Sequence, residues 1–166
     1  MVFLETSRLV LRNWEAGDLE ELVDYRNDDR CTRYQRGQLH EREELAALIQ
    51  RRKNDTFLPE GRKQLAIALK ETNQLVGEIT IFLEDPAITM GYTVSYKHHR
   101  QGYAYEMLSA VIAQLHGCYP DREFICMVEP ENVASMGLLK KLGFDHICYA
   151  PEVTSEVFGK WTLPKE

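Results

Sequence analysis

Strands are predicted where apolar and polar residues alternate along the chain, or where short apolar runs end in turn residues. Glu71–Gln74 joins two apolar runs into a hairpin, and Asp85 with Pro86 makes the next turn. Phe124–Val128 is apolar throughout, which is typical of a strand buried on both faces. The predicted strands are residues 8–13, 64–70, 75–83, 88–94, 124–128, 147–150 and 157–163.

Helices are predicted where apolar residues recur every three or four positions. This spacing is clearest over Tyr103–His116, and weaker versions follow Gly17 and span residues 41–53. Asp18 is expected to cap the first helix, and Gly143 to end a helix over residues 132–142, while residues 54–63 are expected to form a loop. This order of elements predicts an α/β or α+β fold, in which helices flank a mixed central β-sheet in three layers.

Length and composition fit a single domain over residues 1–166, with 44% hydrophobic and 28% charged residues. No apolar run approaches the ~20 residues that cross a bilayer, and the N-terminus does not resemble a secretory signal. We therefore expect a cytoplasmic protein with no membrane partner. No C-x-x-C pair occurs, so reduced structural cysteines and no metal are expected at Cys31, Cys118, Cys126 and Cys148.

The formal net charge of −6 argues against a nucleic-acid partner, because phosphate backbones attract basic surfaces. An acidic protein is compatible with a cationic amine substrate. A mild acidic excess is also a common source of solubility, so charge alone does not choose between these interpretations.

A strand runs into the strongest helix between Val94 and Glu106. The first N–H groups of a helix lack internal partners and carry positive potential, so they can bind phosphate oxygens. Gly102 would let a ligand approach the backbone closely, and Arg100 could add a cation. A single glycine at the start of a helix is a weak signal, and taken alone it favours a tight turn over phosphate binding.

His99–Ala104 resembles the acyl-CoA pyrophosphate loop of the GNAT acetyltransferases, in which Gln or Arg stands three residues before a Gly and Gly or Ala two residues after it. Gly102 and Ala104 match that pattern, whereas the first position is His99. Tyr103–Glu106 is similar to the Gly-Tyr-Ala-x-Glu form of the branch that includes ribosomal-protein N-terminal acetyltransferases.

A second match begins at Asn132, where Asn-x-x-Ser-x-x-Leu-x-x-x-Leu-Gly-Phe ends at Phe144. This resembles the pattern that follows the fifth strand of GNAT enzymes. Arg8–Arg12 and Leu75–Ile79 stand where that family has its first and third strands. The resemblance therefore covers essentially the whole chain, in the order that the family shows.

The resemblance implies transfer of an acetyl group from acetyl-CoA to a primary amine, by direct attack of the amine on the thioester. It implies a V-shaped gap between strands 88–94 and 124–128, where pantetheine would bond to the strand backbone, while Asn132 would hydrogen-bond the cofactor arm. It assigns cofactor contacts to Tyr92, Thr93, Val94, His99, Arg100, Gln101, Gly102, Tyr103, Ala104 and Asn132.

The usual catalytic residues of the family are missing. Many members have a tyrosine acid seven residues after the motif Asn, where this chain has Leu139. Ser135 is then the candidate general acid, although a serine there is also a common capping or packing residue. Many members also have Glu two residues before the Gly of the fourth strand, where this chain has Thr89. The general base is left open between Glu78, Glu84, Asp85 and water.

Weak base catalysis would favour an acceptor that is already partly neutral. An α-amine has a pKa near 7.7–8.0 and a lysine near 10.4, so only the α-amine is appreciably neutral at pH 7. We therefore expect a protein N-terminal α-amine or a small-molecule amine as acceptor. It would be selected by residues 17–63, where the side chains that could line the site, or merely pack, are Tyr25, Arg33, Tyr34 and Arg36.

Two interpretations remain open at this point. One is an active N-acetyltransferase, and the other is a non-catalytic acyl-CoA-binding module of the same fold. Leu139 and Thr89 are the residues that keep the second interpretation open. A monomer and a homodimer are both compatible with the sequence, since the late strands over residues 153–163 could pair between two chains.

Overall fold

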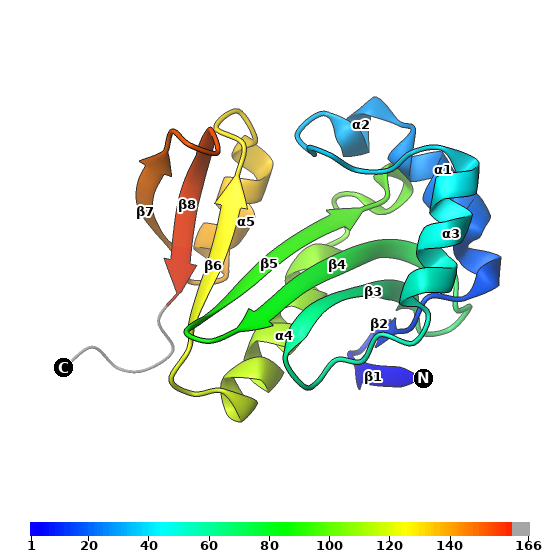
Figure 1. Ribbon diagram of the computed structural model, residues 1–166, viewed down its shortest axis with the longest axis horizontal. Coiled ribbons are helices and arrows are strands. Elements are labelled where there is room, and N and C mark those ends of the chain that lie inside the picture. Colours follow the sequence, from blue (N-terminus) through cyan, green and yellow to red (C-terminus); the bar gives the residue numbers. More distant parts are fainter. Residues whose placement is uncertain (161–166) are drawn as a thin grey trace.

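The computed structural model describes residues 1–160 and contains one eight-stranded sheet with the strand order β1-β2-β3-β4-β5-β6-β8-β7 (Figure 1). Among the strand pairings of these residues, only β5 with β6 is parallel. The strands are β1 (Val2–Glu5), β2 (Leu9–Arg12), β3 (Gly61–Leu69), β4 (Leu75–Glu84), β5 (Ala87–Val94), β6 (Glu123–Val128), β7 (Asp145–Ala150) and β8 (Ser155–Lys160).

Helices cover both faces of the sheet, because side chains of successive strand residues point to opposite faces. Leu65 and Ile67 of β3 belong to a core with α4 and α5, whereas Ala66 packs with α1 and α3. The α-helices are α1 (Leu19–Arg26), α2 (Asp29–Thr32), α3 (Arg42–Arg52), α4 (Tyr103–Cys118) and α5 (Val133–Lys141), and the short 3-10 helices are η1 (Ala16–Asp18) and η2 (Tyr96–His98). The predicted three layers and mixed sheet are confirmed.

Strands β5 and β6 pair over three residues only, from Ala87 opposite Glu123 to Thr89 opposite Ile125. Beyond that point they separate, as Figure 1 shows, while β5 stays paired with β4 up to Val94. The backbone of β5 beyond Thr89 therefore has a free edge. This confirms the predicted separation of the two strands.

The predicted hairpin and the helix that begins at Tyr103 are confirmed, but several details of the sequence interpretation are wrong. Strand β1 and helix α2 were not predicted, because each has only four residues. The loop expected over residues 54–63 is shorter, since β3 begins at Gly61. The last predicted strand begins two residues earlier, at Ser155, and its residues 161–163 lie outside the described residues.

Burial at β6 and in the first helical segment also differs from expectation. Met127 is 53% exposed, so β6 is not buried on both faces; the α1–α3 layer covers β3 and β4 but does not extend over β6. Asp18 does not cap α1. Its carboxylate is buried and accepts hydrogen bonds from Arg12 and from the backbone N–H of Glu15, inside the turn that precedes the helix.

The cysteines divide into two groups. All four are free thiols, as expected, but only Cys31 and Cys126 are buried, whereas Cys118 and Cys148 are exposed. Burial raises the pKa of the Cys126 thiol to about 12, so this residue behaves as a small apolar side chain. No helix within residues 1–160 has the length and apolar character needed to span a membrane.

Candidate active site

The free edge of β5 presents carbonyl oxygens to the separation from β6. Backbone groups alternate in direction along a strand, and Ser95 N–H bonds to Val76 of β4, so the oxygens of Tyr92 and Val94 point away from β4. Gln35 Nε2 lies 3.4 Å from the backbone carbonyl oxygen of Tyr92, and His99 Nε2 lies 2.7 Å from the backbone carbonyl oxygen of Val94. Side chains therefore occupy the positions where an added strand would bond.

The loop His99–Gly102 leads directly into the N-terminus of α4. Gly102 is the N-cap residue with φ of +78°, a left-handed conformation that favours glycine, and it offers no side chain to cap the helix. Within residues 1–160, the first helical hydrogen bond runs from Glu106 N–H to the Gly102 oxygen at 3.0 Å. The backbone N–H groups of the first turn of α4, before Glu106, are therefore available to an anion.

Arg8 supplies a cation at this helix end that the sequence interpretation missed. Its Nη2 lies 3.5 Å from the place where a Cβ on Gly102 would stand, and its guanidinium lies over the Tyr103 ring at 4.5 Å. By contrast, the predicted cation Arg100 is exposed and has a φ of +61°. Arg8 is the first residue of the first predicted strand, and nothing in the sequence indicated this role, because Arg8 reaches Gly102 only after the chain has folded.

Glu106 would repel an anion in the first turn of α4 if its charge were free. Its carboxylate instead accepts hydrogen bonds from the Arg8 backbone N–H at 3.0 Å, from Arg8 Nε at 2.7 Å and from the Thr6 hydroxyl at 2.5 Å. Partial burial opposes its ionisation, but these hydrogen bonds from Thr6 and Arg8 lower the pKa of Glu106 overall. The carboxylate is thus ionised and directed toward the β1–β2 turn.

Asn132 and Ser135 lie at the start of α5, on the other side of the strand separation. Asn132 Oδ1 accepts a hydrogen bond from Ser135 N–H at 3.2 Å, so Asn132 caps the helix. Its Nδ2 atom has no hydrogen-bond partner within the described part of the chain, and could still donate to a ligand. Capping and ligand binding are therefore compatible roles for this side chain.

The Ser135 hydroxyl lies 2.7 Å from the Tyr92 hydroxyl, so a hydrogen bond joins α5 to β5 across the separation. Burial raises the pKa of Tyr92 to about 12, against the smaller opposite effect of this hydrogen bond. Tyr92 therefore remains protonated at neutral pH. Leu139, at the usual position of the tyrosine acid, is 1% exposed and belongs to the hydrophobic core.

The candidate bases occupy different places. Glu78 on β4 is buried, and its carboxylate accepts hydrogen bonds from the Tyr25 hydroxyl and the Arg26 guanidinium. Burial, together with the Glu78 charge, raises the pKa of Tyr25 well above its usual value. Glu84 and Asp85 are exposed at the β4–β5 turn, beside the paired rather than the separated end of β5 and β6.

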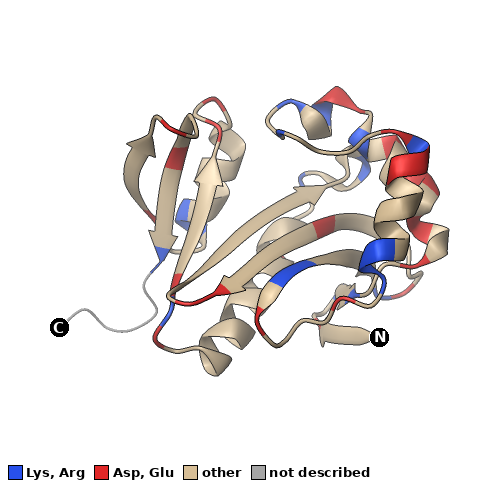
Figure 2. Cartoon of the chain, in the orientation of Figure 1, with Lys and Arg blue, Asp and Glu red and all other residues tan. Residues whose placement is uncertain are grey.

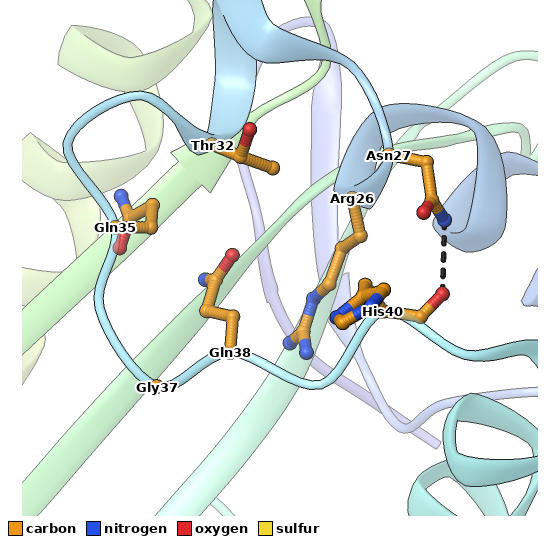
Figure 3. Close-up of a pocket in the computed structure, with 7 residues that line it drawn as sticks. All are labelled: Arg26, Asn27, Thr32, Gln35, Gly37, Gln38 and His40. Atoms are coloured by element: carbon orange, nitrogen blue, oxygen red, sulfur yellow. Dashed lines mark hydrogen bonds between the residues drawn. The ribbon is translucent and has the colours of Figure 1, made fainter.

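Two adjoining cavities flank the segment of residues 33–40, which connects α2 to α3. The first has a volume of about 310 Å³, and Figure 3 shows the side chains of Gln35 and Gln38 projecting from the segment beside it. The second, of about 270 Å³, extends over β3 and β4. Both are lined by Arg26, Gln35, Gly37 and Gln38. Gln38 Nε2 also lies 3.5 Å from the Thr93 hydroxyl, which brings the segment against β5.

A model of the acetyltransferase (GNAT) domain matches residues 8–145, which is most of the chain. The chain belongs to the GNAT family. The family prediction made from the two sequence motifs is therefore confirmed, together with the fold class. Acetyl transfer is the general reaction of this family, with acetyl-CoA as its general donor.

Relatives of this GNAT chain span nearly its full length. The uncharacterized N-acetyltransferase p20 of Bacillus licheniformis is 29% identical over 151 residues, covering 87% of this chain and 83% of p20. A GNAT-family acetyltransferase from Bacillus anthracis is 20% identical, with a TM-score of 0.82 and coverage of 98% and 99% of the two chains. RimL, a ribosomal L7/L12 α-N-protein acetyltransferase solved with coenzyme A, is 14% identical, with a TM-score of 0.78 and coverage of 97% and 98%. The two structural likenesses are likenesses of fold.

The GNAT fold brings most of the predicted site residues to the separated ends of β5 and β6. Tyr92–Val94, the His99–Ala104 loop and the Asn132–Ser135 turn all lie there, whereas Glu84 and Asp85 do not. Within residues 1–160, no group of three or more His, Cys, Asp or Glu side chains is placed to hold a metal ion.

Proposed function

We propose that this GNAT protein transfers the acetyl group of acetyl-CoA to an α-amine or a small-molecule primary amine. The observation that carries this proposal is the free edge of β5 with a binding feature on each side of it. One feature is the α4 N-terminus, which has no side-chain cap and has Arg8 beside it, and the other is the pair of Ser135 and Tyr92 hydroxyls. The first suits the pyrophosphate of the cofactor, and the second suits the thioester.

Cofactor binding in this proposal uses backbone groups more than charged side chains. The N–H groups of Tyr103 and Ala104, with the guanidinium of Arg8, would hold phosphate oxygens. Pantetheine would bond along Tyr92–Val94, displacing the His99 and Gln35 side chains from the carbonyl oxygens there. Asn132 Nδ2 would donate to the same arm of the cofactor.

The chemical step then forms one bond and breaks one. The amine nitrogen attacks the thioester carbonyl carbon, the C–N bond forms, and the C–S bond breaks as the amine proton passes to water. Charge develops on sulfur as the thiolate leaves. The Ser135 hydroxyl would donate to that sulfur, because the protonated Tyr92 hydroxyl can donate to the Ser135 oxygen in turn.

Glu78 is a poor candidate for the base in this scheme, because Arg26 and Tyr25 already occupy its carboxylate. Water then carries off the amine proton, which is easiest for an amine whose pKa lies near neutrality. This supports an α-amine over a lysine side chain as acceptor. The similarity in fold to RimL, an α-N-protein acetyltransferase, agrees with this preference.

The alternative is an acyl-CoA-binding module without activity, and the burial of Leu139 where a tyrosine acid is usual favours it. The test is release of coenzyme A thiol from acetyl-CoA over a panel of peptide α-amines, small amines and lysine side chains. Amine-dependent release, fastest with α-amines, is expected. Binding of acetyl-CoA with no amine-dependent release would establish the module, and equal rates for lysine and α-amines would contradict the assigned acceptor class. Cytoplasmic location and oligomeric state stay predictions.

A further inference from the structure

The second cavity, beside β3 and β4, is lined by an excess of cationic groups. Five arginines contribute to its walls, whereas Glu78 is the only carboxylate that does so in the described part of the chain. Figure 2 shows basic residues at the end of α3 and the start of β3, while acidic residues gather on α1 and the start of α3. The arginines are Arg26, Arg36, Arg51, Arg52 and Arg62.

The protein itself satisfies only some of these guanidinium groups. Arg26 is buried against Glu78, and Arg36 pairs with Glu129. Arg52 Nη1 lies 3.3 Å from Asp55, but its Nε is buried and has no hydrogen-bond partner. Arg36 also donates to the backbone oxygens of Val153 and Thr154, so it is committed to structure.

Arg51 and Arg62 have no carboxylate within 4.0 Å among residues 1–160. The guanidinium carbon of Arg62 lies 5.1 Å from the centre of the Phe82 ring, and this cation–π contact positions the guanidinium without using its N–H donors. Arg51 and Arg62 therefore line the cavity with unused donors, and Arg52, which contacts Asp55 and the Arg62 backbone oxygen, adds a third positive charge beside them. Like charges held together in this way favour a bound anion, and guanidinium groups match carboxylate and phosphate oxygens.

The cavity adjoins the strand where the thioester would lie. Glu78 and Thr80 of β4 form part of its lining, and they stand opposite Thr93 and Gly91 of β5. No atom lies within 4 Å of the place where a Cβ on Gly91 would stand, so the surface there is open. Gln35, which lines the cavity, also contacts the backbone carbonyl oxygen of Tyr92.

The cavity and the hydroxyl pair lie on opposite faces of the sheet. Tyr92 is opposite Ile79, a residue of the core on the α4 side, whereas Thr93 is opposite Glu78 on the α1–α3 side. An acceptor held in the cavity would therefore approach the thioester from the face opposite to Ser135. Amine attack and thiolate protonation would then not compete for the same space.

We propose that the acceptor amine carries an anionic group, a carboxylate or a phosphate monoester, held by Arg51, Arg52 and Arg62. This inference rests on the proposed acetyl transfer and adds the charge of the acceptor to it. The amine end of such an acceptor reaches past Thr80 toward Gly91, while the anionic end stays between α3 and β3. The net charge of −6 on the whole chain thus conceals a local preference of the opposite sign.

The test compares acceptors with and without an anionic group, in thiol-release assays with acetyl-CoA. Glycyl-aspartamide is paired with glycyl-asparaginamide, and O-phosphoethanolamine with ethanolamine, so one pair offers a carboxylate and the other a phosphate. In at least one pair we expect kcat/KM to be higher by about tenfold or more for the anionic member. The pair that shows the larger ratio identifies the anion. Ratios near one in both pairs, or a preference for the neutral members, would overturn the proposal.

Variants assign the preference to this cavity. The double variant Arg51→Gln with Arg62→Gln is expected to bring the ratio close to one. The control Arg42→Gln removes an exposed arginine from the other end of α3, where it pairs with Glu20, and should keep the ratio of the unaltered protein. A ratio unchanged in the double variant would show that the anion binds elsewhere, and would overturn the assignment.

Failure of the proposed acetyl transfer would give a different result from failure of this inference. If no amine is acetylated, calorimetric binding of O-phosphoethanolamine still decides the matter. Tighter binding than that of ethanolamine, lost in the double variant, would support the anion site. Equal or undetectable binding of both probes would reject it.

Discussion

The hydroxyl of Tyr92 lies 2.7 Å from the hydroxyl of Ser135, and this single hydrogen bond spans the place where β5 and β6 part. Tyr92 is mostly buried, and its pKa of about 12 keeps its proton in place at neutral pH. In the proposed reaction, this pair of hydroxyls from β5 and α5 would supply the proton that a tyrosine of α5 supplies in many members of the family.

Replacing Tyr92 by Phe should lower kcat about tenfold and leave KM for acetyl-CoA nearly unchanged, since it removes one hydrogen bond behind Ser135. Ser135→Ala should lower kcat further, by roughly a hundredfold, because it removes the donor to sulfur itself. Steady-state thiol release measures both. Tyr149→Phe, on exposed β7, is the matched control and should behave as the unaltered protein. An unchanged kcat in Tyr92→Phe would contradict the role of the pair.

Replacing Gly102 by Ala should raise KM for acetyl-CoA about tenfold or more, because the new Cβ stands where phosphate oxygens approach the helix end. The φ of +78° also makes alanine unfavourable there, at a cost of about 1 kcal/mol in unfolding free energy. Gly117→Ala in the same helix has open space and serves as control. Equal KM values for the two variants would argue against phosphate binding at this end of α4.

Acid should destabilise the protein partly through Glu106. Its pKa is lowered in the folded state, so its contribution to stability is complete above the unfolded value near 4.5, and is lost as pH falls through the folded value. Urea unfolding from pH 6.5 down to pH 3.5 should therefore show a smaller acid loss in Glu106→Gln than in the unaltered protein. The same slope for both would mean that Thr6 and Arg8 do not favour its charged form.

Replacing Glu78 by Gln should cost about 3–5 kcal/mol of unfolding free energy, because it leaves the Arg26 guanidinium buried without a counter-ion. The double variant Arg26→Met with Glu78→Leu should lose less than the single one, since no uncompensated charge remains. Urea unfolding of the two variants gives the comparison. A double variant less stable than the single one would show that the attraction within the Arg26–Glu78 pair contributes more to the unfolding free energy than the cost of a buried unpaired charge.

Elements with a long, regular pattern could be predicted from the sequence, and short or three-dimensional features could not. The helix from Tyr103 shows helical periodicity up to His116, close to its observed end at Cys118, and the glycine of its N-cap is visible in the sequence. Four-residue β1 has no such signal. The burial of β6 depends on which layer covers it, so the apolar run over Phe124–Val128 was misread.

The residues of the candidate site also fall into those that local sequence motifs predict and those that only the folded structure brings together. Gly102, Asn132 and Ser135 were found because local motifs carry them, whereas Arg8 reaches Gly102 only after the chain has folded. Tyr92 was expected to contribute its backbone alone. Its hydroxyl meets Ser135 because β5 and α5 pack together, although 43 positions separate the two residues along the chain.

One consequence of the buried Arg26–Glu78 pair concerns how these two positions could change. Arg26 neutralises the only carboxylate that lines the second cavity within residues 1–160. Loss of this one side chain would leave the buried Glu78 carboxylate with the Tyr25 hydroxyl as its remaining donor, an uncompensated negative charge in a wall that is otherwise cationic. A lineage that lost Arg26 would therefore have to change Glu78 as well, so positions 26 and 78 are expected to vary together rather than one at a time.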